Sequence, residues 1–182
     1  MKSITIKKIV IIFVPLLLGL GVIYYASLPT SGIVDFDYNR DAQEVHALFN
    51  RDWYWLIAAS QDEYDFDFVL RYRALHQNLA SAGSLNMKVF RENNEFKGFV
   101  AYHKLTPEVC KILFLAVKSD ERKKGYGKQL AEYAIHDLFE HGCKKIILIT
   151  RPGNEKALRL YGKLGFKETG HDEEFFYMEL NK

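Results

Sequence analysis

The chain has 182 residues, of which 48% are hydrophobic and 26% charged, and its formal net charge is +2. This composition excludes a disordered chain and is typical of one globular domain with an appendage. The nearly balanced charge gives no indication of a nucleic-acid partner. Two isolated cysteines and six scattered histidines give no support to a metal site, so we expect none.

The N-terminal segment differs in composition from the rest of the chain. Ile9 to Tyr25 form an apolar run of 17 residues, close to the roughly 20 that a helix needs to cross a bilayer. We therefore expect residues 1–29 to be a single-pass membrane anchor that spans residues 9–26. A cleaved signal peptide is the alternative, although cleavage after Ala26 would leave Tyr24 at a position that favours small residues. Three lysines precede the run, which by the positive-inside rule places the following domain outside the cytosol.

The first half of the domain, which we expect over residues 30–182, alternates strand and helix patterns. A first strand is predicted at Ile33–Tyr38. Two helices follow at Asp41–Asn50 and Phe66–Asn78, the first with Asp41 as a possible N-cap. Alternating residues around a polar turn then predict a hairpin of Leu85–Arg91 and Phe96–Lys104.

The second half of the domain continues this alternation. The predicted elements are a buried strand Cys110–Lys118, a helix Gly125–His141, a buried strand Lys145–Thr150, a helix Asn154–Leu164, and closing strands Phe166–Thr169 and Glu174–Leu180. The pattern predicts an α/β (α+β) domain with a mixed central sheet flanked by helices.

The most informative stretch is the turn between the strand Cys110–Lys118 and the helix that follows it. Gly125 and Gly127 open this helix, after the basic residues Arg122, Lys123 and Lys124. The first N–H groups of a helix have no internal partners, and glycines let a phosphate approach them closely. The Walker pattern is absent, and Leu130 stands where the dinucleotide fingerprint requires a third glycine. The turn is therefore predicted to bind the phosphates of another ligand.

Arg122-x-x-Gly125-x-Gly127 resembles the pyrophosphate loop of the GNAT superfamily of N-acetyltransferases. A second stretch, from Asn154 to Phe166, is similar to that family's N-x-x-A-x-x-L-Y-x-x-x-G-F pattern. The resemblance extends over roughly residues 96–180. It implies a GNAT-like acyltransferase fold and acetyl-CoA as co-substrate.

The resemblance also implies roles for individual residues. Tyr161 stands at the position of the usual proton donor and would protonate the departing CoA thiolate. The main chain of the strand before the loop would bind the pantetheine arm and polarise the thioester carbonyl. The remaining residues would hold the pyrophosphate or, for Asn154, the cofactor arm. The implied cofactor-binding residues are Leu115, Ala116, Val117, Arg122, Lys123, Lys124, Gly125, Tyr126, Gly127, Lys128 and Asn154.

The implied reaction is direct attack of a primary amine on acetyl-CoA, without a covalent enzyme intermediate. Many protein N-terminal acetyltransferases of the family carry a glutamate where this chain has Ile149, so the general base is not assigned. A non-catalytic acyl-CoA-binding or sensing domain is the first alternative, and an interaction protein that binds no nucleotide is the second. Because acetyl-CoA is a cytosolic metabolite, the side of the membrane stays open.

Two further features allow two interpretations each. Residues 35–67 hold nine acidic and two basic side chains, which indicate either a solvated surface, the interpretation we favour, or an acceptor site for cationic amines. Trp53, Tyr54 and Trp55 would line the latter. Cys110 and Cys143 start neighbouring strands, and we expect buried thiols rather than a disulfide.

Overall fold

The structure, a computed structural model, describes residues 31–57, 64–75 and 77–182. The predicted anchor at residues 9–26 lies outside the described residues, as does the whole segment 1–30. Within the described ranges, no helix is both long and apolar enough to cross a membrane.

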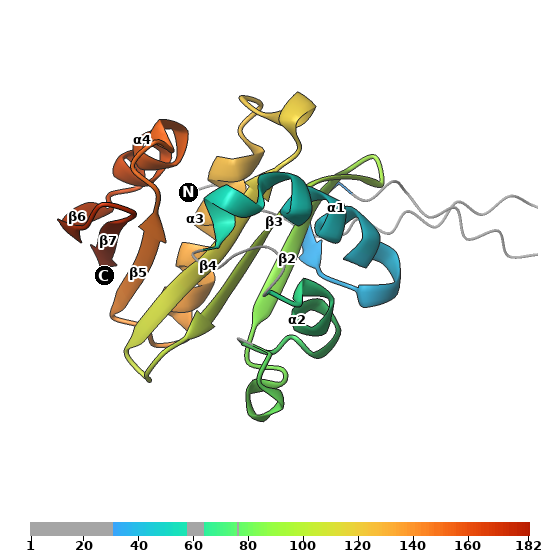
Figure 1. The fold of residues 1–182 in the computed structure, drawn as a ribbon, viewed down its shortest axis with the longest axis horizontal. Coiled ribbons are helices and arrows are strands. Elements are labelled where there is room, and N and C mark those ends of the chain that lie inside the picture. The colour runs from blue at the N-terminus through green and yellow to red at the C-terminus, as the bar shows by residue number, and fades with distance from the viewer. Residues whose placement is uncertain (1–30, 58–63, 76) are drawn as a thin grey trace, which may run out of the picture.

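A seven-stranded mixed sheet forms the centre of the molecule (Figure 1). Its order is β1-β2-β3-β4-β5-β7-β6, and only β4 and β5 pair in parallel. The strands are β1 Gly32–Asp35, β2 Asn86–Glu92, β3 Glu95–Lys104, β4 Val109–Val117, β5 Lys145–Thr150, β6 Lys167–His171 and β7 Phe176–Asn181. The predicted mixed sheet flanked by helices is confirmed.

Helices cover both faces of the sheet. They are α1 Tyr38–Leu56, α2 Phe66–Tyr72, α3 Tyr126–Glu140 and α4 Glu155–Lys163, with short 3-10 turns at Leu79–Ser81 and Ser119–Glu121. In Figure 1, α1 and α2 lie in front of β2 to β4 and α3 lies behind. Each face has its own core: Val45, Phe49 and Phe66 belong to the first, and Leu130, Ala134 and Ile146 to the second.

Several boundaries in the first half of the domain differ from the sequence prediction. The first strand ends at Asp35 rather than Tyr38, and α1 ends at Leu56, six residues after the predicted Asn50. α1 begins at Tyr38, three residues before the predicted start, and its N-cap is Asp37 rather than Asp41. The Asp37 carboxylate accepts a hydrogen bond from the Arg40 N–H at 2.9 Å. α2 ends at Tyr72, well before Asn78, because Arg73 adopts a left-handed conformation with φ of 46° and stops the helix.

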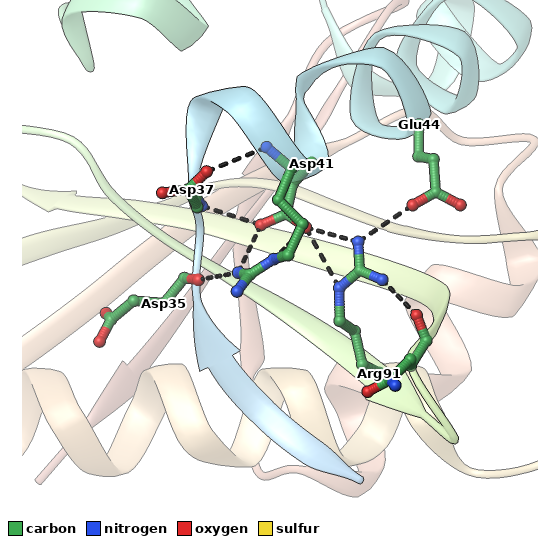
Figure 2. Close-up of polar contacts among 7 residues, drawn as sticks. Asp35, Asp37, Asp41, Glu44 and Arg91 are labelled. Atoms are coloured by element: carbon green, nitrogen blue, oxygen red, sulfur yellow. Dashed lines mark hydrogen bonds and ion pairs between the residues drawn. The ribbon is translucent and has the colours of Figure 1, made fainter. Parts of the chain in front are cut away.

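Asp41 instead belongs to a buried ion-pair network that joins α1 to β2 (Figure 2). Its side chain is fully buried, and the Arg91 guanidinium donates to it from Nη2 at 2.6 Å. Arg91 also donates to Glu44 at 3.1 Å, and the Arg40 guanidinium donates to Asp41 from the other side at 2.8 Å. A charged carboxylate deep in the fold is tolerated because every side of it has a donor.

The same network fixes the protonation state of Asp41. Burial alone would raise its pKa, but the hydrogen bonds from Arg40, from the Asp37 N–H and from Arg91 together outweigh burial and lower that pKa. A carboxyl with a lowered pKa in the folded state stabilises the fold above its unfolded pKa of about 3.9, and this stability is lost as the pH falls through the folded pKa.

We therefore expect Asp41→Asn to lower the free energy of unfolding at pH 7 by roughly 3 kcal/mol, since it leaves the charge of Arg91 buried beside a neutral amide. Urea denaturation measures the change. Glu44→Gln is the matched control, because Glu44 is 41% exposed and its pair with Arg91 contributes less than about 1 kcal/mol. A loss of equal size in the two variants would contradict the central place of Asp41.

The expectation of free thiols is wrong. Cys110 at the start of β4 and Cys143 just before β5 form a disulfide, with their Cα atoms 6.1 Å apart. Both residues are buried. The parallel pairing of β4 with β5 brings the two backbones within the distance that a disulfide requires. The bond thus links the two strands at the end where they are paired.

Candidate functional site

The site is built on the separation of β4 from β5. These parallel strands share only three register pairs, from Val109↔Lys145 to Lys111↔Ile147. Beyond Lys111, β4 continues to Val117 with β3 on one side, and no register pair with β5 is formed on the other. Figure 1 shows the two strands close together at one end and apart at the other. Backbone groups on that edge of β4 therefore need a partner from outside the sheet.

The N-terminus of α3 lies directly after this strand and offers further backbone donors. Gly125 is the N-cap, with φ of 93°, and no side chain caps the helix. The first amide bonded within the helix is that of Gln129, which donates to the Gly125 carbonyl at 3.0 Å. The N–H groups of Tyr126, Gly127 and Lys128 precede it. Together with the helix dipole, they are arranged to bind an anion.

Three elements converge at Gly127. A Cβ on this residue would lie 3.4 Å from the Val117 side chain on β4 and 4.0 Å from the Leu160 side chain on α4. A methyl group at this position would be in ordinary van der Waals contact with both side chains. Gly127 thus lies where the end of β4, the uncapped start of α3 and α4 meet. These features fit the diphosphate and arm of a coenzyme A molecule.

The basic side chains of the loop are mostly bound to neighbouring acids. Arg122 donates to Asp52 on α1 at 2.5 Å and to the Val117 carbonyl at 3.1 Å. Lys124 donates to Glu121 at 2.6 Å, and Lys128 lies 3.5 Å from Glu132. Lys123 has a left-handed backbone with φ of 68° and completes the turn. The loop therefore presents its backbone amides, while its charged side chains hold its shape.

Lys97 and Glu121 form an ion pair that supports the loop, and the sequence analysis identified neither residue. Lys97 is 5% exposed and donates to Glu121 at 2.8 Å and to Glu95 at 2.7 Å. Hydrogen bonds from Lys124 and Lys97 lower the pKa of Glu121 to about 2, so it is ionised throughout the physiological range. The sequence around Lys97 gives no indication of this role, because its partner Glu121 lies 24 residues away.

α4 carries the other predicted residues. The Asn154 side chain caps this helix and accepts from the Ala157 N–H at 3.3 Å. Tyr161 is 7% exposed and belongs to the same apolar cluster as Tyr126. The side chains of Leu115 and Val117 pack against this cluster. Among the described residues, its hydroxyl has no hydrogen-bond partner. Burial raises its pKa, so it keeps its proton at neutral pH.

A cavity of about 380 Å³ lies where the chain leaves β5. Tyr54 and Trp55 line it, and both are largely exposed, whereas Trp53 packs against the core. Its remaining lining residues are Arg151, Pro152, Gly153, Glu173 and Glu174. Ile149 on β5, the position compared above with a family glutamate, is exposed. Among the described lining residues, the carboxylates are those of Glu173 and Glu174.

The acidic segment 35–67 is partly solvated and partly bound within the fold. Asp37 and Asp65 cap helices, Asp41 is buried, and Asp52 is paired with Arg122. Asp35, Asp37 and Asp65 are exposed. Asp62 and Glu63 lie outside the described residues. The acidic groups of the cavity come from the connection between β6 and β7.

Residues 42–166 match the model of the acetyltransferase (GNAT) family. The chain belongs to this family. The match extends from the first turn of α1 to the end of α4, so it includes the loop, the unpaired strand edge and Tyr161.

Relatives and solved structures agree with this assignment. The chain is 33% identical over 75 residues to mycothiol acetyltransferase of Corynebacterium glutamicum, covering 41% of this chain and 26% of the relative. It is 40% identical over 70 residues to N-alpha-acetyltransferase 30 of Xenopus laevis, covering 38% and 24%. These matches thus span about a quarter of each relative. The fold is shared with the PaiA N-acetyltransferase of Thermoplasma acidophilum, solved in complex with coenzyme A, at a TM-score of 0.64 and 18% identity over 82% of this chain and 98% of that one.

The left-handed N-cap of α3 leads to a test. Gly125→Ala should weaken CoA binding by about tenfold, because a Cβ strains a residue at φ of 93° and shifts the amides that follow it. Isothermal titration with CoA measures the dissociation constant. Gly162→Ala is the control, since this α4 glycine faces open space and the added methyl should stabilise the helix by about 0.5–1 kcal/mol. Unchanged CoA affinity in Gly125→Ala would show that the loop is not the binding site.

Proposed function

We propose that the chain transfers an acetyl group from acetyl-CoA to a primary amine by direct attack. The observation that carries the proposal is the unpaired edge of β4 beside the uncapped N-terminus of α3. One surface thus offers main-chain groups for an extended arm and helix amides for a diphosphate. Membership of an acetyltransferase family supports acetyl as the group that is transferred.

The binding role of each segment follows from its geometry. Backbone groups of Leu115, Ala116 and Val117 would bind the pantetheine arm along the edge that β5 leaves free. The Val117 carbonyl already accepts a hydrogen bond from Arg122, and we expect the Val117 N–H to donate to the arm. The loop residues from Lys123 to Lys128 would hold the diphosphate through their amides, and Asn154 would lie beside the arm.

The chemistry requires two proton movements. The amine nitrogen adds to the thioester carbon and gives a tetrahedral oxyanion, which a main-chain N–H of β4 stabilises; the bond from carbon to sulfur then breaks as the carbonyl re-forms. The Tyr161 hydroxyl gives its proton to the departing thiolate. Burial raises the pKa of Tyr161, which keeps the phenol protonated before the transfer but makes it a weaker acid. The proton released by the amine passes to solvent, and the tyrosinate regains a proton from solvent before the next reaction.

The cavity beside β5 is proposed as the acceptor site. Its exposed aromatic rings and its two glutamates favour a cationic amine, by stacking and by charge attraction. N-alpha-acetyltransferase 30 is named for a protein α-amine, which makes a peptide with a free N-terminus a second class of acceptor to test. The membrane anchor at residues 9–26 remains a prediction, and the side of the membrane on which the domain lies stays open.

A transfer assay with labelled acetyl-CoA, spermidine and a peptide with a free N-terminus tests the function. Tyr161→Phe should lower the transfer rate by about a hundredfold and leave CoA affinity within about twofold, because only the proton donor is removed. Tyr72→Phe, a change at an exposed α2 tyrosine, is the matched control and should retain full activity.

A thermal-shift titration with CoA separates the alternatives. Ligand at 100 times its dissociation constant should stabilise the fold by about 2.7 kcal/mol. CoA binding without transfer to any amine would favour a sensing domain, and no shift at all would favour an interaction protein.

A further inference from the structure

Arg151 is the first residue after β5, and its side chain reaches across to the end of α1. Its Nε donates to the Tyr54 carbonyl at 2.6 Å, and its Nη2 donates to the Ile57 carbonyl at 3.2 Å. The side chain is only 12% exposed. These bonds join residues more than 90 positions apart in the chain, at the rim of the cavity described above.

The end of α1 requires such a partner. The last carbonyl groups of a helix have no internal donors, and the helix dipole places negative charge there. The last turn of α1 contains no basic residue of its own. Arg151 therefore supplies from another element the positive charge and the donors that this helix end lacks.

The same guanidinium also fixes two aromatic rings. Its Cζ lies 4.2 Å from the centroid of the Tyr54 ring and 4.8 Å from that of Phe175. Phe175 belongs to the connection between β6 and β7, whose Glu174 lies 3.9 Å from the guanidinium. Arg151 is thus held between α1 and that connection, and it sets the distance between the two walls of the cavity.

The main chain of Arg151 contacts the start of α4. Its carbonyl accepts from the Asn154 N–H at 2.9 Å, and Asn154 caps the helix that carries Tyr161. One residue therefore contacts the acceptor walls through its side chain and the start of α4 through its backbone.

We propose that Arg151 is a positioning residue that assembles the acceptor wall from the end of α1 and the connection between β6 and β7. The proposal rests on the proposed function, because it takes the cavity to be the acceptor site. Arg151 acts through Tyr54, Trp55 and Phe175 and touches no reacting atom. A lysine cannot replace it, since only the planar fork of arginine reaches two carbonyl groups while it stacks on two rings.

The test compares Arg151→Lys and Arg151→Gln with a control, Arg159→Gln. Arg159 is an exposed arginine on α4 that pairs with Glu155, so this variant removes one nearby charge without disturbing the cavity. The chain has two tryptophans, Trp53 and Trp55, and both lie on the last two turns of α1. Quenching of their fluorescence by acrylamide therefore reports the exposure of the wall without any substrate.

Both Arg151 variants should raise the acrylamide quenching constant by about twofold, while Arg159→Gln leaves it unchanged. They should also lower kcat/KM for spermidine or the peptide by about tenfold or more, with CoA affinity retained within about twofold, because misplacement of the acceptor slows transfer without altering the diphosphate site. If Arg151→Gln fails to fold, Arg151→Lys, which keeps the charge, is compared with Arg159→Gln in its place.

Other outcomes overturn the inference. Wild-type quenching and kcat/KM in Arg151→Lys would show that the fork is not needed. An equal loss of CoA affinity and of acceptor kcat/KM would show a general structural role. If the wild-type chain transfers acetyl to none of the amines, the proposed function fails, and the quenching result alone decides whether Arg151 positions the wall.

Discussion

The separation of two parallel strands is the constraint on which the rest of the structure depends. β4 and β5 are held together at one end by three register pairs and by the disulfide between Cys110 and Cys143. Past Lys111 the two strands are no longer paired with each other, while β4 stays paired with β3 and β5 stays paired with β7. A sheet in which these strands stayed paired would have no free main-chain groups at its centre. The opening therefore creates the surface that a thioester arm could occupy.

Ion pairs around this opening stabilise its walls and leave the backbone free to bind. Arg122 joins the loop to Asp52 on α1, and Glu121 accepts hydrogen bonds from both Lys97 and Lys124. The loop is thus rich in positive charge in the sequence but presents mainly amides in the fold. This division suits a ligand that must leave after each reaction, because amides of a helix N-terminus bind a diphosphate without the full strength of several free cations.

Local patterns predicted much of this arrangement. The paired glycines, the buried strands and the helix capped by Asn154 are each specified by residues close in sequence, so the mixed sheet and the position of the turn before α3 were predicted correctly. The end of α2 was missed because Arg73 takes a left-handed conformation without the glycine or asparagine that usually marks one. The burial of Asp41 was missed because Arg91 lies 50 residues away. The contacts of Arg151 likewise join residues more than 90 positions apart, and no local pattern encodes them. The disulfide was missed for another reason, because neighbouring strands place the two cysteines close together but do not decide whether their thiols are oxidised.

Amide chemical shifts in a nitrogen-15-labelled chain titrated with CoA measure the central claim most directly. The largest changes should fall on Gly125, Gly127 and Lys128, and on the β4 amides from Leu115 to Val117, whereas the paired end of β4 near Cys110 should hardly change. Pantetheine, which lacks the diphosphate, should move the β4 amides and leave those of the loop in place. Shifts confined to other parts of the molecule, or equal effects of the two ligands on the loop, would contradict the assignment of this opening as the acetyl-CoA site.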